Sequence, residues 1–490
     1  MPERATVKNR SEKSAEAVLA AGMGRRAERE GGSTAVALGS ARHQKPGRPG
    51  RAAQGTGEAE PDGGRDEARL ARQGEEDSGQ DLLAQVLSKA NMVRAWKRVK
   101  ANRGSAGVDG LSITETVEYL KTHWPGVREE LRDGRYRPMP VRRVQIPKAG
   151  GGSRELGIPT VTDRLIQQAM LQVLQPMIDP TFSESSYGFR PGRRAHDAVL
   201  KAQSYVQDGR RIVVDVDLEK FFDRVNHDVL MDRLAKRIAD KAVLRLIRHY
   251  LNAGIMDHGV ECERYEGTPQ GGPLSPLLAN VLLDEVDREL EKRGLCFVRY
   301  ADDCNVYVRS QQAGERVLDG LRRCYAQLHL KVNESKTAVA LVRGRKFLGY
   351  CFWMTGKGEV KRAVATKALA AYKMRIRQLT RRMRGRSLDQ VAEQLRQYIP
   401  GWKAYFHLAQ TPKVFRELDE WLRHRLRALQ LKQWRRPQTI LRELRALGAT
   451  DAHALPVAGN ARCWWRNSRM NLNALLPIAF FDRIGVPRLA

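Results

Sequence analysis

The sequence lacks the features of a secreted or membrane-embedded chain. Its six cysteines are scattered without a Cys-x-x-Cys pair, which argues against a disulfide framework and against a cysteine-based zinc module. The longest apolar stretches, such as residues 472–481, fall well short of a membrane span, and residues 1–10 have no apolar signal segment. We therefore expect a protein that acts inside a cell and has no membrane partner.

Residues 1–80 lack aromatic residues altogether, although the whole chain has 32 of them. The same segment has no isoleucine and carries 13 of the 42 glycines. Such a composition cannot bury enough apolar surface to offset the entropy lost on ordering. We predict that residues 1–80 form a disordered tail.

Acidic residues are too few to balance the basic ones. The chain has 86 Lys and Arg against 56 Asp and Glu, a net charge of +30, which points to a polyanionic partner such as nucleic acid. The tail is nearly neutral, with 14 basic and 13 acidic side chains, whereas residues 361–490 hold 27 basic and only 8 acidic ones. The densest positive charge is therefore expected near the C-terminus.

A length of 490 residues predicts two to four domains. After the tail, residues 81–138 have a helical pattern that is interrupted by a Gly-rich turn at 102–110. Short strands alternate with helices over 139–360, which favours an α+β domain. Residues 361–445 show an all-helical pattern, and residues 446–490 are either a reduced DNA-binding tail or a helical cap.

The region from 361 onward predicts a basic helical bundle. Apolar residues recur every three or four positions in its first helix, and basic residues cover the remaining surface. Ser387 with Gln390 forms a capping box for a second helix, and Thr411 with Pro412 begins a third. The bundle contains three tryptophans, Trp402, Trp421 and Trp434, which either form an RNA-contacting surface or pack in a core. We favour the core for each one.

Two acidic segments suggest a metal site. Residues 296–308 form two alternating apolar runs joined by a tight turn with the adjacent carboxylates Asp302 and Asp303. Adjacent acids between apolar strands are costly to desolvate unless a cation accompanies them, although such a turn alone is usually a solvated hairpin tip. A second β-branched run ends in Asp215 and Asp217, so two separate segments offer the oxygen ligands that Mg²⁺ prefers.

A Gly-rich loop at residues 268–274 leads into a well-marked helix. Ser275 is the expected N-cap and Pro276 the first helical residue, and Gly294 is expected to end the helix. A loop of this kind at a helix N-terminus suits the close approach of a nucleotide.

These segments together resemble the reverse transcriptase/maturase proteins encoded by group II introns. The Tyr-Ala-Asp-Asp turn at 300–303 matches the polymerase active-site turn of that family, and residues 270–276 match its Gln-Gly-x-x-x-Ser-Pro nucleotide loop. Further matching motifs lie at 146–148 with Arg154, 157–159, 187–192, 346–350, 107–110 and 401–406. The resemblance covers roughly residues 81–445.

The resemblance implies an α+β right-hand polymerase, with the fingers and palm of a reverse transcriptase, followed by an all-α basic thumb and maturase domain. It implies that Asp217, Asp302 and Asp303 hold two Mg²⁺ ions and that dNTPs are substrates. The nucleotide-binding residues that it implies are Lys148, Arg154, Phe222 and Gln270. The basic residues expected to bind RNA are Arg375, Arg377, Arg381, Arg382 and Lys403.

Asp215 and Asp217 lie on the same face of their strand and compete for the role of first metal ligand. In the family's motif an aromatic residue stands five positions after the catalytic Asp. Phe222 stands five positions after Asp217, whereas Lys220 stands five after Asp215. We therefore assign the role to Asp217 and expect Asp215 and Asp223 to be structural or solvated.

The function expected from the resemblance is copying of group II intron RNA into DNA at an insertion site, combined with assistance to splicing. The expected partners are intron RNA, an RNA template with a DNA primer, and target DNA, in the bacterial cytoplasm or nucleoid; the sequence leaves monomer and homodimer open. Two alternatives are a splicing-only RNA-binding maturase and a reverse transcriptase recruited to host defence or diversity generation. Because no cysteine pair follows residue 445, we expect the Cys-rich HNH endonuclease of the longest family members to be absent.

Overall fold

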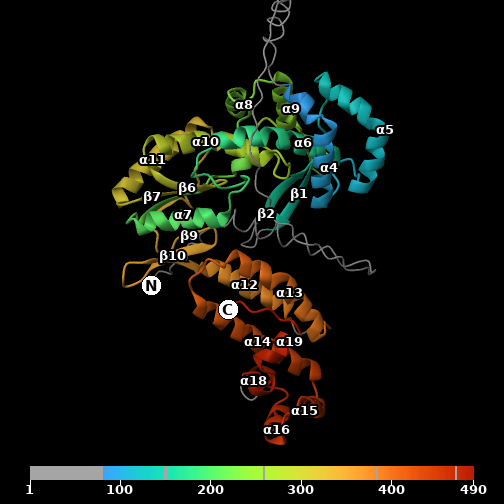
Figure 1. Ribbon diagram of the computed structural model, residues 1–490, viewed down its shortest axis with the longest axis vertical. Coiled ribbons are helices and arrows are strands. Elements are labelled where there is room, and N and C mark those ends of the chain that lie inside the picture. The colour runs from blue at the N-terminus through green and yellow to red at the C-terminus, as the bar shows by residue number, and fades with distance from the viewer. Residues whose placement is uncertain (1–80, 148–152, 258–259, 382–384, 470–471) are drawn as a thin grey trace, which may run out of the picture.

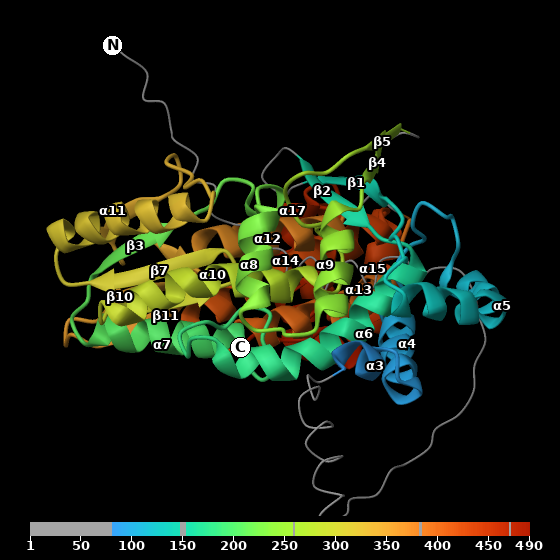
Figure 2. The ribbon, with the colours of Figure 1, turned by 90° about the horizontal axis from the view of Figure 1, so that it is seen from above.

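The computed structural model describes residues 81–147, 153–257, 260–381, 385–469 and 472–490 (Figure 1). The predicted tail at 1–80, Lys148, Arg382 and the side chain of Arg154 lie outside the described residues. Figures 1 and 2 both show the helices α4 and α5 at one end of the upper part of the molecule, and β7 and α11 at the other. The C-terminal helices, from α12 onward, form the lower part in Figure 1.

The N-terminal helices pack around α6, which is buried on most of its surface. Asn91 fixes one of these contacts, because its buried side-chain amide donates to the carbonyls of Val86 and Ala169, each at 3.0 Å. A capping box between Ser112 and Glu115 fixes the start of the helix that begins at Ile113. The helices are α3 (Leu82–Val86), α4 (Lys89–Asn102), α5 (Ile113–Arg132) and α6 (Val161–Ile178).

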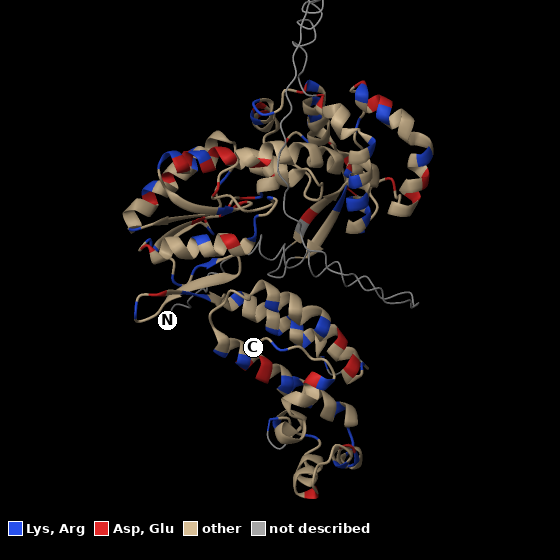
Figure 3. Cartoon of the chain, in the orientation of Figure 1, with Lys and Arg blue, Asp and Glu red and all other residues tan. Residues whose placement is uncertain are grey.

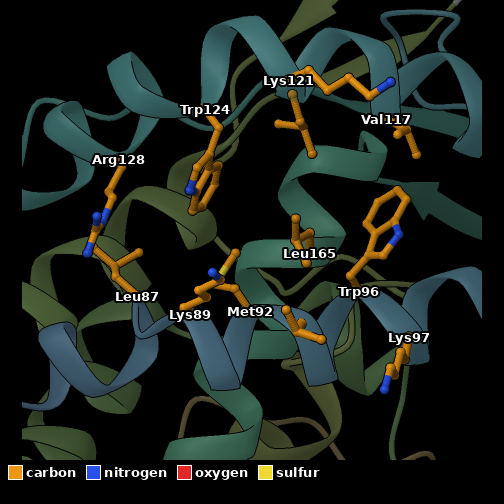
Figure 4. Close-up of a pocket in the computed structure, with 12 residues that line it drawn as sticks. Leu87, Lys89, Met92, Trp96, Lys97, Val117, Lys121, Trp124, Arg128 and Leu165 are labelled. Atoms are coloured by element: carbon orange, nitrogen blue, oxygen red, sulfur yellow. The ribbon is translucent and has the colours of Figure 1, made fainter.

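A groove of about 610 Å³ lies between α4 and α5 (Figure 4). Trp96 and Trp124 flank it, and Leu165 of α6 lies between them in the view. The groove contains none of the site residues predicted from the sequence.

Two four-stranded sheets form the upper part of the molecule. The first has the order β2-β1-β4-β5, with β1 and β2 paired as an antiparallel hairpin. The second has the order β6-β7-β3-β8, and all of its neighbouring strands are antiparallel. The strands are β1 (Val141–Pro147), β2 (Ser153–Ile158), β3 (Ile212–Val216), β4 (Ile255–Asp257), β5 (Val260–Cys262), β6 (Cys296–Tyr300), β7 (Asp303–Val308) and β8 (Ala338–Leu341).

The second sheet separates two hydrophobic cores. Alternating side chains of β3 point to opposite faces, so Val214 belongs to the core under α10 and α11, whereas Val213 belongs to the core on the α7 side. Figure 1 shows the same order of layers, with α10 and α11 above the sheet and α7 below it. The helices of this part are α7 (Ala195–Gln207), α8 (His227–Ala235), α9 (Lys241–Asn252), α10 (Ser275–Lys292) and α11 (Gln311–Gln327).

The second core continues into a small sheet of order β11-β10-β9 and then into the C-terminal helices. The predicted capping box of Ser387 and Gln390 is confirmed, as is the start of the following helix at Thr411 and Pro412. Trp402 is buried in this core, as expected, whereas Trp421 and Trp434 are half-buried. The elements are β9 (Lys346–Phe347), β10 (Tyr350–Met354), β11 (Val360–Val364), α12 (Thr366–Leu379), α13 (Leu388–Tyr405) and α14 (Pro412–Trp434).

The chain then turns back along α13 and α14. Residues 484–489, which we call the C-terminal strap, bury Val486 and Leu489 in the second core. The Leu489 N–H donates to the Asp419 carboxylate at 3.0 Å, and Arg423 donates to the carbonyl of Pro487 at 3.4 Å. Residues 472–489 therefore pack as a helical cap; DNA binding by this segment stays a prediction. The short helices are α15 (Pro437–Ala446), α16 (Asp451–Gly459), α17 (Trp464–Asn467), α18 (Leu472–Leu475) and α19 (Ile478–Arg483).

Within the described ranges, no helix is both long enough and apolar enough to cross a membrane.

Candidate active site

The Tyr-Ala-Asp-Asp segment forms the tight turn between β6 and β7, as the sequence predicts. Tyr300 pairs with Asp303 across the hairpin, and Ala301 adopts a left-handed conformation with φ of +57°. Left-handed backbone is costly for a residue with a Cβ, and such strain collects at functional sites. The two carboxylates therefore stand on a turn whose shape the surrounding structure imposes.

Asp217 follows β3 and lies beside this turn. In the antiparallel register of β3 and β7, Val216 pairs with Cys304, so one further step brings position 217 opposite position 303. The two acidic segments, more than eighty residues apart in sequence, are thus brought together at one end of the sheet.

Lys336 is a site residue that the sequence reading missed. Its ammonium lies 2.8 Å from the Asp217 carboxylate, and both residues are buried, with exposed fractions of 7% and 5%. The pair forms because residues 331–337 run beside the end of β3, with the Asn333 N–H donating to the Asp217 carbonyl at 2.8 Å. A buried carboxylate requires a compensating cation, and here Lys336 provides it.

Asp215 has a different partner. Its carboxylate is largely buried and lies 3.2 Å from the guanidinium of Arg345. Burial raises the pKa of Asp215 to about 6, and the nearby Arg345 opposes that shift. This ion pair agrees with the structural alternative for Asp215.

The three predicted ligands have the donor chemistry that a hard divalent cation requires, because all are carboxylates at adjoining backbone positions. Within the described part of the chain, however, no three His, Cys, Asp or Glu side chains are grouped closely enough to hold a metal ion. The Asp217 carboxylate is turned towards Lys336 instead. The donor set therefore fits Mg²⁺, and the side chains would have to converge to bind it.

The predicted nucleotide loop is fastened to the segment that contains Phe222. The Thr268 N–H donates to the Phe222 carbonyl and the Gly267 N–H to the Val225 carbonyl, both at 2.7 Å. At its other end the loop reaches β2, where the Gly157 N–H donates to the Gln270 carbonyl at 3.1 Å. Three segments predicted to contact the nucleotide are therefore adjacent: 221–223, 267–271 and β2, the strand that carries Arg154.

His227 holds the same loop from α8. Its Nε2 lies 2.8 Å from the Gly267 carbonyl and its Nδ1 lies 3.2 Å from the Asn252 side-chain oxygen. Burial lowers the pKa of His227, which favours the neutral ring. Nε2 is then the donor to Gly267.

Phe222 and Gln270 are both half-buried. Phe222 packs at the edge of the first core, with its ring 5.0 Å from the fully buried ring of Phe221. This placement is compatible with the predicted contact between Phe222 and the nucleotide and equally with a role in core packing. The helix after the loop begins one residue earlier than expected: Leu274 is the N-cap of α10, and the Ser275 hydroxyl donates to the Pro269 carbonyl at 2.8 Å.

Arg299 supports the Tyr-Ala-Asp-Asp turn from within the protein, and sequence reasoning missed it. It is fully buried beside Asp287, with which it forms an ion pair. Its guanidinium also donates to the carbonyl of Ala301 at 3.0 Å, to the Asn280 side chain at 2.9 Å and to the Ser186 hydroxyl at 2.8 Å. One side chain thus joins the turn to α10 and to the chain segment around residue 186.

The predicted RNA-binding residues that the structure describes lie on the surface of the C-terminal region, where Figure 3 shows Lys and Arg spread along α12, α13 and α14. Arg375 and Arg381 are exposed, and the Arg377 guanidinium lies over the ring of Trp421 at 5.7 Å. Arg425 lies 5.3 Å from the same ring. Lys403 is also exposed, but its ammonium donates to the Arg488 carbonyl of the C-terminal strap at 3.2 Å.

Comparison with known proteins agrees with this geometry. Residues 146–352 match the family described as reverse transcriptase (RNA-dependent DNA polymerase), and residues 369–447 match the group II intron maturase-specific domain. Protein YkfC of Escherichia coli (strain K12) is 33% identical over an alignment of 313 residues that covers 55% of this chain and 82% of that protein. Group II intron-encoded protein LtrA of Lactococcus lactis subsp. cremoris is 37% identical over 195 residues, 40% of this chain but only 32% of LtrA.

One chain of a solved structure titled partial Cas6-RT-Cas1–Cas2 complex is 26% identical to this chain, with a TM-score of 0.34. The superposition covers 50% of this chain and 43% of that chain. A superposition this partial supports no conclusion about function.

The fold and the matched domain define an RNA-directed DNA polymerase of the reverse transcriptase class. The maturase-specific domain that follows narrows the assignment: the chain belongs to the family of group II intron-encoded reverse transcriptases and maturases.

Proposed function

We propose that this protein copies group II intron RNA into DNA at an insertion site and binds the same RNA as a maturase that assists splicing. The observation that carries the polymerase part is the register of β3 and β7, which brings Asp217 beside the turn that contains Asp302 and Asp303. The maturase part is supported by the matched domain at 369–447 and by the exposed basic side chains of α12.

Asp217, Asp302 and Asp303 would hold two Mg²⁺ ions. When bound, the metal would lower the pKa of the primer 3′-hydroxyl and offset the charge that develops at the α-phosphate. Lys336 supplies the opposite charge beside the buried Asp217 carboxylate, at 2.8 Å. Arg299 holds the turn that orients the other two carboxylates.

The nucleotide would lie against the segments fastened together around Gly267. Phe222 and Gln270 belong to these segments, and Lys148 and Arg154 would contact the triphosphate as charge-assisted donors. In this proposal residues 81–138 form an N-terminal extension, 139–360 the fingers and palm, 361–445 the thumb and maturase domain, and 446–490 a reduced DNA-binding tail or helical cap that includes the packed residues 472–489.

Of the alternatives, a splicing-only maturase is disfavoured because the three carboxylates are present together with the buried network that supports their turn. A role in host defence is disfavoured by the match to the group II intron maturase-specific domain. The partners that follow are intron RNA, an RNA template with a DNA primer, and target DNA; the choice between monomer and homodimer is a matter for measurement.

The proposal is tested by primer extension on an intron RNA template with the full chain. We expect wild-type protein to synthesise DNA and Asp217→Asn to lose about 1000-fold in rate, because loss of a metal ligand removes several kcal/mol of transition-state stabilisation. Asp228→Asn is the matched control, since Asp228 is an exposed carboxylate paired with Arg248. Equal rates in wild type and Asp217→Asn would refute the assignment of this carboxylate.

A further inference from the structure

The segment between Ser183 and Arg190 packs directly on the catalytic turn. The Tyr187 N–H donates to the Arg299 carbonyl and the Arg299 N–H to the Ser185 carbonyl, both at 2.9 Å. At Gly188 a Cβ atom would clash with the backbone nitrogen of Ala301. Only glycine fits at this contact, so the neighbouring residue 189 is placed one peptide away from the Tyr-Ala-Asp-Asp turn.

That neighbour, Phe189, has two features that are unfavourable for folding. Its φ is +61°, a left-handed conformation that is strained for an aromatic residue, and 44% of its surface is exposed. Its ring belongs to neither of the two hydrophobic cores formed by the described residues. The side chain therefore gains little from burial in return for the strain.

The strained backbone is held from both sides. The buried Asn280 side chain donates to the Gly188 carbonyl at 2.8 Å, and Gln175 donates to the Phe189 carbonyl at 3.4 Å. The next residue, Arg190, is almost fully buried and donates to the Asp179 carboxylate at 3.0 Å and to the Ser186 carbonyl at 3.0 Å. These contacts fix the loop without using the ring of Phe189.

We propose that Phe189 is a positioning residue for the nucleic-acid substrate, whose ring stacks on a base of the template strand beside the catalytic turn. The inference rests on the proposed polymerase function. Every base has a flat π-face, so an exposed aromatic ring supports stacking without sequence preference, as an enzyme that copies any template requires. The surrounding structure imposes backbone strain on Phe189, whose ring is exposed beside the reacting centre. A stacking contact with a template base accounts for that strain.

The test uses Phe189→Gly, because glycine adopts positive φ without strain and lacks the ring. His329→Gly is the matched control: His329 is also exposed, has φ of +56° and lies just beyond the C-terminal end of α11. We expect both variants to unfold at the same or a higher temperature than wild type. Only Phe189→Gly should weaken template–primer binding, by about 10-fold, and Phe189→Tyr should restore it.

A second readout is independent of catalysis. 2-Aminopurine at the templating position loses fluorescence when it stacks, so wild-type protein should quench it more than Phe189→Gly does, in binding buffer without Mg²⁺ or dNTP. Unchanged affinity and fluorescence in Phe189→Gly would overturn the proposal, as would a lower unfolding temperature or an effect confined to the KM for dNTP. If wild type quenches the probe but synthesises no DNA, the polymerase function fails while the stacking contact stands.

Discussion

A single side chain, that of Arg299, supports the Tyr-Ala-Asp-Asp turn. It is fully buried with Asp287, and burial raises the pKa of that carboxyl while the Arg299 charge opposes the shift. Truncating the Arg299 side chain would leave the buried Asp287 charge unpaired, which would lower the stability of the fold by about 3–5 kcal/mol. The activity of such a variant would not distinguish misfolding from loss of function. A lysine keeps the charge but lacks the planar fork that reaches Ala301, Asn280 and Ser186 together.

We therefore expect Arg299→Lys to fold but to synthesise DNA with a kcat about 10- to 100-fold lower, because the carboxylates of the turn are displaced from their working positions. Template–primer affinity should stay within about 2-fold of wild type, since the binding surface is untouched. Arg322→Lys, at an exposed ion pair with Glu334, is the control. A normal kcat in Arg299→Lys would show that the turn keeps its shape without the fork.

Phe222 is predicted to exclude ribonucleotides, because a ring packed under the sugar would clash with a 2′-hydroxyl. Phe222→Val should therefore raise the kcat/KM for rNTPs relative to dNTPs by about 10-fold or more. Phe221→Leu is the control for packing, since that ring is buried in the first core and touches the ring of Phe222. Unchanged sugar discrimination in Phe222→Val would leave core packing as the role of this ring.

Sequence reasoning succeeded where the deciding residues are neighbours in the chain. The hairpin at 296–308, the capping box of Ser387 and the start of α14 each depend on residues within a few positions. Lys336 and His227 were missed because their partners, Asp217 and Gly267, lie 119 and 40 residues away in the sequence. Arg299 was missed because its role includes a contact with Ser186, which lies 113 residues away. No periodicity or local motif marks a side chain whose role depends on such a distant contact.

At the scale of elements, α12 presents a cationic face towards solvent while its apolar residues Tyr372, Ile376 and Leu379 are buried in the second core. The guanidinium groups of Arg377 and Arg425 both lie over the ring of Trp421 in α14, at 5.7 and 5.3 Å from its centroid. Cation–π contacts of this kind hold both guanidinium groups beside the ring of Trp421. The pattern of apolar and basic residues predicted this helix, but the pairing with Trp421 needed the packing of α12 against α14.

Reversing Arg375, Arg377 and Arg381 to Glu should weaken intron RNA binding and flatten its salt dependence. Each lost phosphate contact removes about 0.7–0.9 from the slope of log affinity against log salt, so three lost contacts lower the slope by about 2. The control reverses three exposed arginines of the polymerase part with the same change of charge, Arg309, Arg316 and Arg323. Equal losses in both triple variants would mean that net charge alone, and not the face of α12, determines affinity.

At the scale of the whole molecule, one sheet serves two cores. Its α10 side packs with the helices that position the carboxylates, and its other side packs with α7 and the C-terminal bundle. The sequence predicted an α+β part followed by a basic helical part, because composition and charge change at about residue 361. It did not predict that residues 472–489 return to α13 and α14, since that contact depends on Asp419 and Arg423 meeting backbone groups 70 and 64 residues away in the sequence.

The two activities should be separable, because in the proposed function DNA synthesis depends on the carboxylates of one turn and splicing assistance depends on a basic surface that stabilises folded RNA. Replacing Asp302 and Asp303 by Ala removes two proposed metal ligands and leaves α12–α14 unchanged. We expect the double variant to lose DNA synthesis while it retains intron binding and splicing within about 2-fold. The loss of two acidic groups makes the surface slightly more attractive to phosphate.

The measurement is both assays on the same preparation of the double variant, with circular dichroism to establish that it is folded. A folded double variant that loses splicing together with synthesis would show that the Tyr-Ala-Asp-Asp turn also takes part in binding the intron. The two activities would then not be separable.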